Sequence, residues 1–88
     1  MESLERDLEI IEEARKWFLI HLQGYPPIKV TVSEYAGGVS TLSEELRTMS
    51  ARASHEICEK YGCSLTHNQA SIALISAMNG LKLIQIEP

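Results

Sequence analysis

Two cysteines and two histidines follow one another closely in the second half of the chain, in the order His55, Cys58, Cys63 and His67. Two thiolates and two imidazoles are a ligand set that tetrahedral Zn²⁺ accepts, and residues three apart on a helix share a face. The spacing matches no established zinc motif, and free cysteine is also a common small core residue. A zinc site is therefore one hypothesis, and ordinary packing is its alternative.

Cys63 and His67 also offer the chemistry of a nucleophile beside a base. A thiol close to the start of a helix ionises more readily, which favours nucleophilic attack. The chain contains no Asp after Asp7, and its later Glu residues form no recognisable catalytic pair. A thiol- or zinc-dependent enzyme is thus an alternative reading, whereas the sequence as a whole favours a non-catalytic protein without a cofactor.

A glycine-containing segment, with Gly37 and Gly38 followed by Ser40 and Thr41, joins an expected strand to an expected helix. Backbone N–H groups at a helix N-terminus, together with nearby hydroxyls, can hold a phosphate or a carboxylate. The segment lacks the lysine of a phosphate-binding loop and the glycine spacing of a dinucleotide site. Anion binding is therefore a hypothesis beside the simpler interpretation of a connecting loop.

Residues 54–79 fit two helices joined by a short turn, with His67, Asn68 and Gln69 at the start of the second helix. Asn and Gln at such a position can hydrogen-bond to adenine edges. However, neither the turn nor the second helix contains Lys or Arg to hold phosphates, and the net charge is −4. A helix-turn-helix nucleic-acid-binding regulator is an alternative to an ordinary helical hairpin, and nucleic acid is not the expected partner.

The periodicity of apolar residues predicts the first elements that would position these side chains. Spacings of three, four and seven predict a helix over 4–22, and alternation predicts a strand over 28–34 with Ile28, Val30 and Val32 facing inward. Residues 35–40 are expected to form a loop. Thr41 and Glu44 fit a capping box, so a second helix is expected to begin there.

That second helix is predicted to end near Tyr61, because Gly62 follows it. A third helix should run from a Thr66 cap to Met78, with Gly80 supplying a left-handed residue after its end. A last strand over 81–86 has apolar residues on both faces, which predicts an interior position. The fold class is α+β: one domain over 1–88, with two layers in the order α-β-α-α-β and three helices covering one face of a small sheet.

Self-association is expected for two reasons. A chain of 88 residues buries only roughly 60 to 65 % of its unfolded surface, and a sheet of two strands is marginally stable. The first helix also carries a wide apolar arc, and the third helix contains no charged residue. The sheet is therefore predicted to be completed by dimerisation, and six small or apolar residues are the expected oligomer interface: Ile10, Ala14, Trp17, Ala70, Ala73 and Ala77.

Composition sets the remaining expectations. The chain is 44 % hydrophobic and 23 % charged, which is typical of a folded domain. It contains no run of ~20 apolar residues, and acidic residues occupy the beginning, where a secretory signal would be basic and then apolar. We expect a cytoplasmic protein with free thiols and no membrane contact. Its predicted function is that of a small homo-oligomeric, non-catalytic module that binds another protein or a small ligand.

Overall fold

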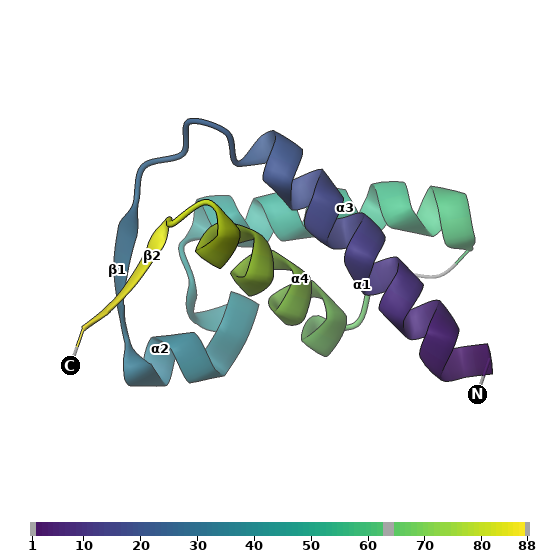
Figure 1. The fold of residues 1–88 in the computed structure, drawn as a ribbon, viewed down its shortest axis with the longest axis horizontal. Helices are drawn as coiled ribbons and strands as arrows, with labels where there is room; N and C mark the ends of the chain where they lie inside the picture. Colours follow the sequence, from purple (N-terminus) through teal and green to yellow (C-terminus); the bar gives the residue numbers. More distant parts are fainter. Residues whose placement is uncertain (1, 63–64, 88) are drawn as a thin grey trace.

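The computed structural model describes residues 2–62 and 65–87, which form four α-helices, a short 3-10 helix and two strands (Figure 1). The elements are α1 (Glu2–His21), β1 (Ile28–Thr31), α2 (Val32–Gly37), η1 (Gly38–Thr41), α3 (Glu44–Tyr61), α4 (His67–Gly80) and β2 (Ile84–Glu87). Apart from the six-residue α2 and the 3-10 helix, the elements follow one another in the order α-β-α-α-β. The predicted α+β class and element order are confirmed.

The core lies where α1 packs along α4. Residues of α1 at spacings of four, Ile10, Ala14 and Phe18, are at most 2 % exposed, because they share the face that meets α4. On α4, Ala73 and Ala77 have no exposed surface. Alanine side chains let two helix backbones approach closely, and the two helices run in the same direction (Figure 1).

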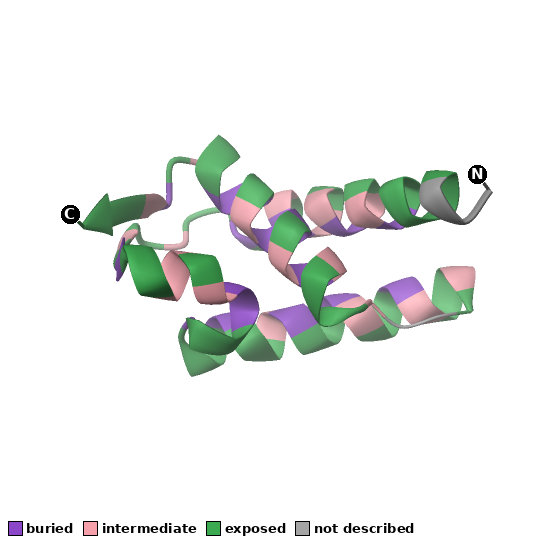
Figure 2. Cartoon of the chain, turned by 90° about the horizontal axis from the view of Figure 1, so that it is seen from below, coloured by how far each residue is buried: buried purple, intermediate pink, exposed green. Residues whose placement is uncertain are grey.

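Helix α3 lies beside α1 and closes the core from a second side. Its N-terminus is capped by Ser43, and Gly62 ends it in the left-handed conformation with φ of +76°, as the sequence predicts. Leu46, Ala53 and Ile57 are buried, and Figure 2 shows the buried residues of α1 and α3 turned toward the interior.

In the described part of the chain, no helix is long and apolar enough to cross a bilayer.

The two strands pair in parallel, with Ile28 opposite Ile84 and Val30 opposite Ile86. These four residues share one face of the sheet, because side chains alternate along a strand. The expectation of an interior last strand is wrong, since β2 alternates apolar and polar residues and its residues 85–87 are exposed. The sheet also lies at one end of the molecule, nearest α2 and the end of α4, rather than beneath three helices (Figure 1).

The segment between β1 and α3 differs most from expectation. The strand ends at Thr31 because a capping box starts α2 there. The Thr31 hydroxyl accepts the N–H of Glu34, and the Glu34 carboxylate accepts the N–H of Thr31. Val32 is consequently 63 % exposed instead of facing inward. The expected loop is helical, as α2 and η1, and Ser43 rather than Thr41 caps α3.

The end of α4 also differs in one detail. Thr66 and Gln69 form the capping box that starts this helix where a Thr66 cap was predicted. The left-handed residue after the helix is Lys82, with φ of +58°, and not Gly80. Lys82 donates its backbone N–H to the carbonyl of Asn79 at 3.1 Å, which turns the chain into β2.

Candidate functional site

The structure separates the residues of the zinc hypothesis. His55 is exposed on α3, with Nε2 3.3 Å from Oε1 of Glu59, and Cys58 is partly buried on the same helix. His67 begins α4 beside η1, and its Nε2 would lie 3.7 Å from a Cβ added to Gly38. Cys63 lies outside the described residues. Within residues 2–62 and 65–87 no three metal-ligating side chains converge, so the zinc site, like the Cys63–His67 nucleophile, stays a prediction.

The proposed anion-binding residues make internal hydrogen bonds. Ser40 donates its hydroxyl to the carbonyl of Gly37 at 3.2 Å, and Thr41 donates to the carbonyl of Gly38 at 2.9 Å and also contacts that of Glu34. The backbone N–H of Gly38 caps α2 by donating to Tyr35. An anion would have to replace these bonds. Anion binding at Gly37, Gly38, Ser40 and Thr41 therefore stays a prediction without geometric support.

The three residues of the nucleic-acid hypothesis differ in whether their side chains are free to contact a ligand. His67 and Asn68 are exposed, whereas Gln69 uses both ends of its amide. Its oxygen accepts the N–H of Thr66 at 2.9 Å, and its nitrogen donates to Oδ1 of Asp7 at 3.2 Å. The carboxylate of Asp7 beside the helix start would repel a phosphate backbone. The turn includes two residues outside the described ranges, and binding through residues 54–79 stays a prediction.

The structure places most residues of the expected oligomer interface inside a single chain, and the interface itself stays a prediction. Five of its six residues are at most 6 % exposed, and they form the contact between α1 and α4 inside a single chain: Ile10, Ala14, Ala70, Ala73 and Ala77. The alanine edge of α4 thus meets α1 of the same molecule. Trp17 alone of the six remains accessible, and it is half-buried on the side of α1 that faces α3.

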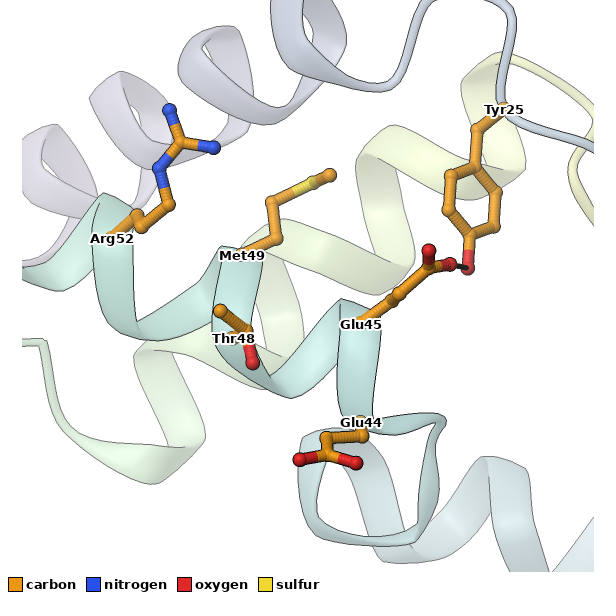
Figure 3. Close-up of a pocket in the computed structure, with 6 residues that line it drawn as sticks. All are labelled: Tyr25, Glu44, Glu45, Thr48, Met49 and Arg52. Carbon is orange, nitrogen blue, oxygen red and sulfur yellow. Dashed lines mark hydrogen bonds between the residues drawn. The ribbon is translucent and has the colours of Figure 1, made fainter.

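Three adjoining hollows follow the outer side of α3 and its junction with α1. The first has a volume of about 460 Å³ and is lined by Tyr25, Glu44, Glu45, Thr48, Met49 and Arg52 (Figure 3). The second, of about 390 Å³, shares Thr48 and Arg52 with it. The third, of about 360 Å³, shares Glu56 with the second and reaches Trp17, Ile20 and Lys60. We call this continuous surface, from Tyr25 to Lys60, the α1–α3 groove.

Trp17 is held firmly in the third hollow of the α1–α3 groove. The His21 ring stacks on it at 3.7 Å with an interplanar angle of 12°, and the Phe18 ring meets it edge-on at 5.4 Å. The Arg52 guanidinium lies 5.7 Å from the indole centroid, a cation–π arrangement, and the indole N–H donates to the Glu56 carboxylate. Contacts from two helices therefore fix the orientation of this side chain.

The two ends of the groove differ in charge, since acids outnumber bases in the first hollow and equal them in the third. Glu44 and Glu45 lie at one end, where the Tyr25 hydroxyl donates to Glu45 at 3.1 Å. At the other end Lys60 donates to Glu13 at 3.2 Å, and this hydrogen bond raises the pKa of Lys60. The residues that line the three hollows include no cysteine and no serine. The arrangement can recognise a ligand through these charged groups and the apolar side chains beside them.

Most of the residues that build this groove were not singled out in the sequence. Met49, Arg52 and Glu56 recur at spacings of three and four in α3, which places them on one face of the helix. That face carries one apolar, one basic and one acidic residue, so its pattern resembles an ordinary solvated surface. The pattern becomes informative only beside Trp17, 35 positions earlier than Arg52 in the chain.

No relative was found. Comparisons of the chain with models of protein families, with curated proteins and with solved structures gave no match. Function is therefore inferred from the chemistry of the α1–α3 groove and of the sheet.

Proposed function

We propose that this protein is a small, non-catalytic interaction module that binds a segment of a partner protein in the α1–α3 groove. The observation that supports this function is the fixed, half-buried indole of Trp17, which lines the third hollow and contacts Arg52 and Glu56, two residues that also line the second. Trp, Tyr, Arg and Met are the residue types enriched at protein interfaces, and an aromatic side chain that is already held in place loses little entropy on binding.

The difference in charge between the ends of the groove indicates what kind of segment would fit. Ile20, 69 % exposed, offers an apolar contact in the same hollow as Trp17, and Met49 offers one in the first hollow. Glu44 and Glu45 at one end would attract a basic residue of the partner. At the other end the two lysines are balanced by Glu13 and Glu56, which line the same hollow. The ligand is accordingly an amphipathic segment that carries a basic residue beside its apolar residues.

Peptide selection tests this proposal. A random peptide display library is selected on the wild-type chain, and enriched peptides are synthesised and titrated against the protein. The chain has a single tryptophan, so the fluorescence of Trp17 reports occupation of the groove directly. We expect the enriched peptides to shift this fluorescence and to place a basic residue near their apolar centre.

A matched pair of variants supplies the control. Ile20→Gln removes an exposed apolar side chain from the groove, and Ile72→Gln removes a comparably exposed one, 54 % accessible, from α4. The first variant should bind the peptides at least about tenfold more weakly, and the second should bind them like the wild type. Peptides that bind both variants equally and leave Trp17 fluorescence unchanged would disprove the proposal, as would failure to enrich any peptide.

A further inference from the structure

The two strands of the sheet differ in which backbone groups they direct outward. Along a strand, successive residues direct their N–H and C=O groups to opposite edges. The Ile28 N–H donates to the Leu83 carbonyl at 2.7 Å, so Leu83 directs its carbonyl toward β1, and Gln85 and Glu87 follow the same direction. Ile84 and Ile86 therefore direct their N–H and C=O groups away from β1, at the outer edge of β2.

The outer edge of β1 is closed. The same alternation places the backbone groups of Lys29 and Thr31 at this edge. The Thr31 N–H is taken by Oε1 of Glu34 at 2.9 Å, and α2 begins at the next residue. An added strand would have to break the capping box that starts α2, so β1 is a poor site for further pairing.

The outer edge of β2 is open. Gln85, Ile86 and Glu87 are exposed, and no backbone group elsewhere in the described chain hydrogen-bonds to this edge. Figure 2 shows β2 projecting from one end of the molecule. Ile86 is 46 % exposed although it shares a face with the buried Val30. The sheet therefore presents both unused backbone groups and uncovered apolar surface at the same strand.

We propose that β2 pairs with β2 of a second copy of this chain, antiparallel about a two-fold axis through Gln85. In this register Ile84 lies opposite the partner's Ile86, and the two residues exchange both backbone hydrogen bonds. The symmetric pair doubles this number, so about four N–H···O=C bonds join the two chains. The isoleucine side chains meet on the apolar face, and Gln85 meets the partner's Gln85 on the polar face.

Neighbouring symmetric registers are excluded by local chemistry. An axis between Gln85 and Ile86 would place Gln85 opposite the partner's Ile86. The backbone groups of Ile86 point outward, but those of Gln85 already bond to β1, so the two residues could not pair. An axis at Ile84 would set Ile86 opposite Lys82, whose φ of +58° is not extended. An axis at Ile86 would set Ile84 opposite Pro88, which has no N–H to donate.

The resulting four-stranded sheet, in the order β1-β2-β2-β1, removes the marginal stability of two isolated strands. This inference deepens the self-association expected of the chain and is separate from the α1–α3 groove, none of whose lining residues belongs to β2. Pairing of four-residue strands buries less surface than a standard interface of roughly 800 Å² per partner. The dimer should accordingly be weak, with a Kd on the order of 100 μM.

Proline substitutions at the two outer edges test the proposal. Ile86→Pro removes an N–H that the intermolecular pairing requires, and it leaves the β1–β2 hydrogen bonds in place because that N–H points away from β1. Lys29→Pro is the matched control, since it removes an outward N–H from the closed edge. Sedimentation equilibrium over roughly 10 μM to 1 mM should show dimers for the wild type and for Lys29→Pro, and monomers for Ile86→Pro.

A cross-link reports the register itself. With Cys58 and Cys63 replaced by serine, Gln85→Cys should form a disulfide-linked dimer on mild oxidation, since directly opposed residues in an antiparallel pair lie about 4.5–5.5 Å apart. A monomeric wild type at 1 mM, an Ile86→Pro variant that dimerises normally, or a Gln85→Cys variant that does not cross-link would each overturn the proposal. Ile20→Gln should dimerise like the wild type, so failure of the groove and failure of the strand pairing remain distinguishable.

Discussion

The backbone N–H of Val39 donates to the hydroxyl of Ser71 at 3.1 Å and so ties η1 to α4. The adjacent Gly38 has φ of +70°, and a Cβ added to it would lie 2.5 Å from the same Ser71 oxygen. The glycine that suggested an anion site in the sequence is thus required for a close contact between two segments of the same chain. Its replacement should reveal this role.

Gly38→Ala is expected to destabilise the fold by roughly 3 kcal/mol. Strain at a positive φ contributes about 1–2 kcal/mol, and displacement of Ser71 and of the η1 backbone contributes the rest. Urea unfolding followed by circular dichroism measures the loss. Gly24→Ala is the control, because Gly24 has φ of +81° and nothing within 4 Å of an added Cβ. Equal losses in the two variants would mean that the Ser71 contact carries no weight.

Ser71→Ala should lower the free energy of unfolding by about 1–2 kcal/mol. The variant leaves the part-buried N–H of Val39 without its acceptor, and an unsatisfied buried donor is costly. Ser76→Ala on the same helix is the comparison, since Ser76 is exposed and alanine favours helix formation. Chemical denaturation of both variants decides the matter: if Ser71→Ala is as stable as Ser76→Ala, the hydrogen bond does not stabilise the fold.

Ala14→Leu tests whether Ala14 packs within one chain or between two copies. Ala14 has no exposed surface at the α1–α4 contact, so a larger side chain should force the helices apart and destabilise the monomer by roughly 1–3 kcal/mol. Ala51→Leu, on the exposed face of α3, should change stability by no more than about 0.5 kcal/mol. Thermal unfolding at low micromolar concentration measures both. A stable Ala14→Leu monomer with altered association would restore the intermolecular interpretation.

Glu12→Gln should alter the dependence of stability on acid. Arg15 donates to the Glu12 carboxylate at 2.6 and 2.9 Å, and this hydrogen bond lowers the pKa of Glu12 below its ordinary value of 4.5. The ionised group therefore stabilises the folded state above that value, and the stabilisation is lost as the pH falls through the lowered pKa. The Tm difference between wild type and variant should be constant above the ordinary pKa of 4.5 and should shrink as the pH falls through the lowered pKa of Glu12.

The size of this effect should be small, because both side chains are exposed and such pairs contribute little. The same melts at about 1 M salt provide the check, since salt screens exposed ion pairs. A Tm difference that persists unchanged at low pH would show that Glu12 acts through packing and not through its charge.

The sequence alone determined the features that depend on neighbouring residues. The span of α1, the left-handed stop at Gly62 and the cap at Thr66 were all predicted, because periodicity and capping chemistry act within about one helical turn. The length of β1 was misjudged where two local signals overlap. Thr31 to Glu34 fit both an alternating strand and a capping box, and the capping box prevails because it satisfies backbone donors at the start of α2.

Only the tertiary structure decided which surface each element covers. The alanine edge of α4 is visible in the sequence. An apolar surface has no intrinsic partner, because the hydrophobic effect is not directional. Whether this edge packs against α1 or against a second copy therefore depends on how the connecting segments place the helices. Likewise Trp17 and Arg52 meet because α3 lies beside α1. Which edge of the sheet is open was also decided by the tertiary structure, because β2 pairs with β1 on one side only and the Glu34 cap occupies the outer edge of β1.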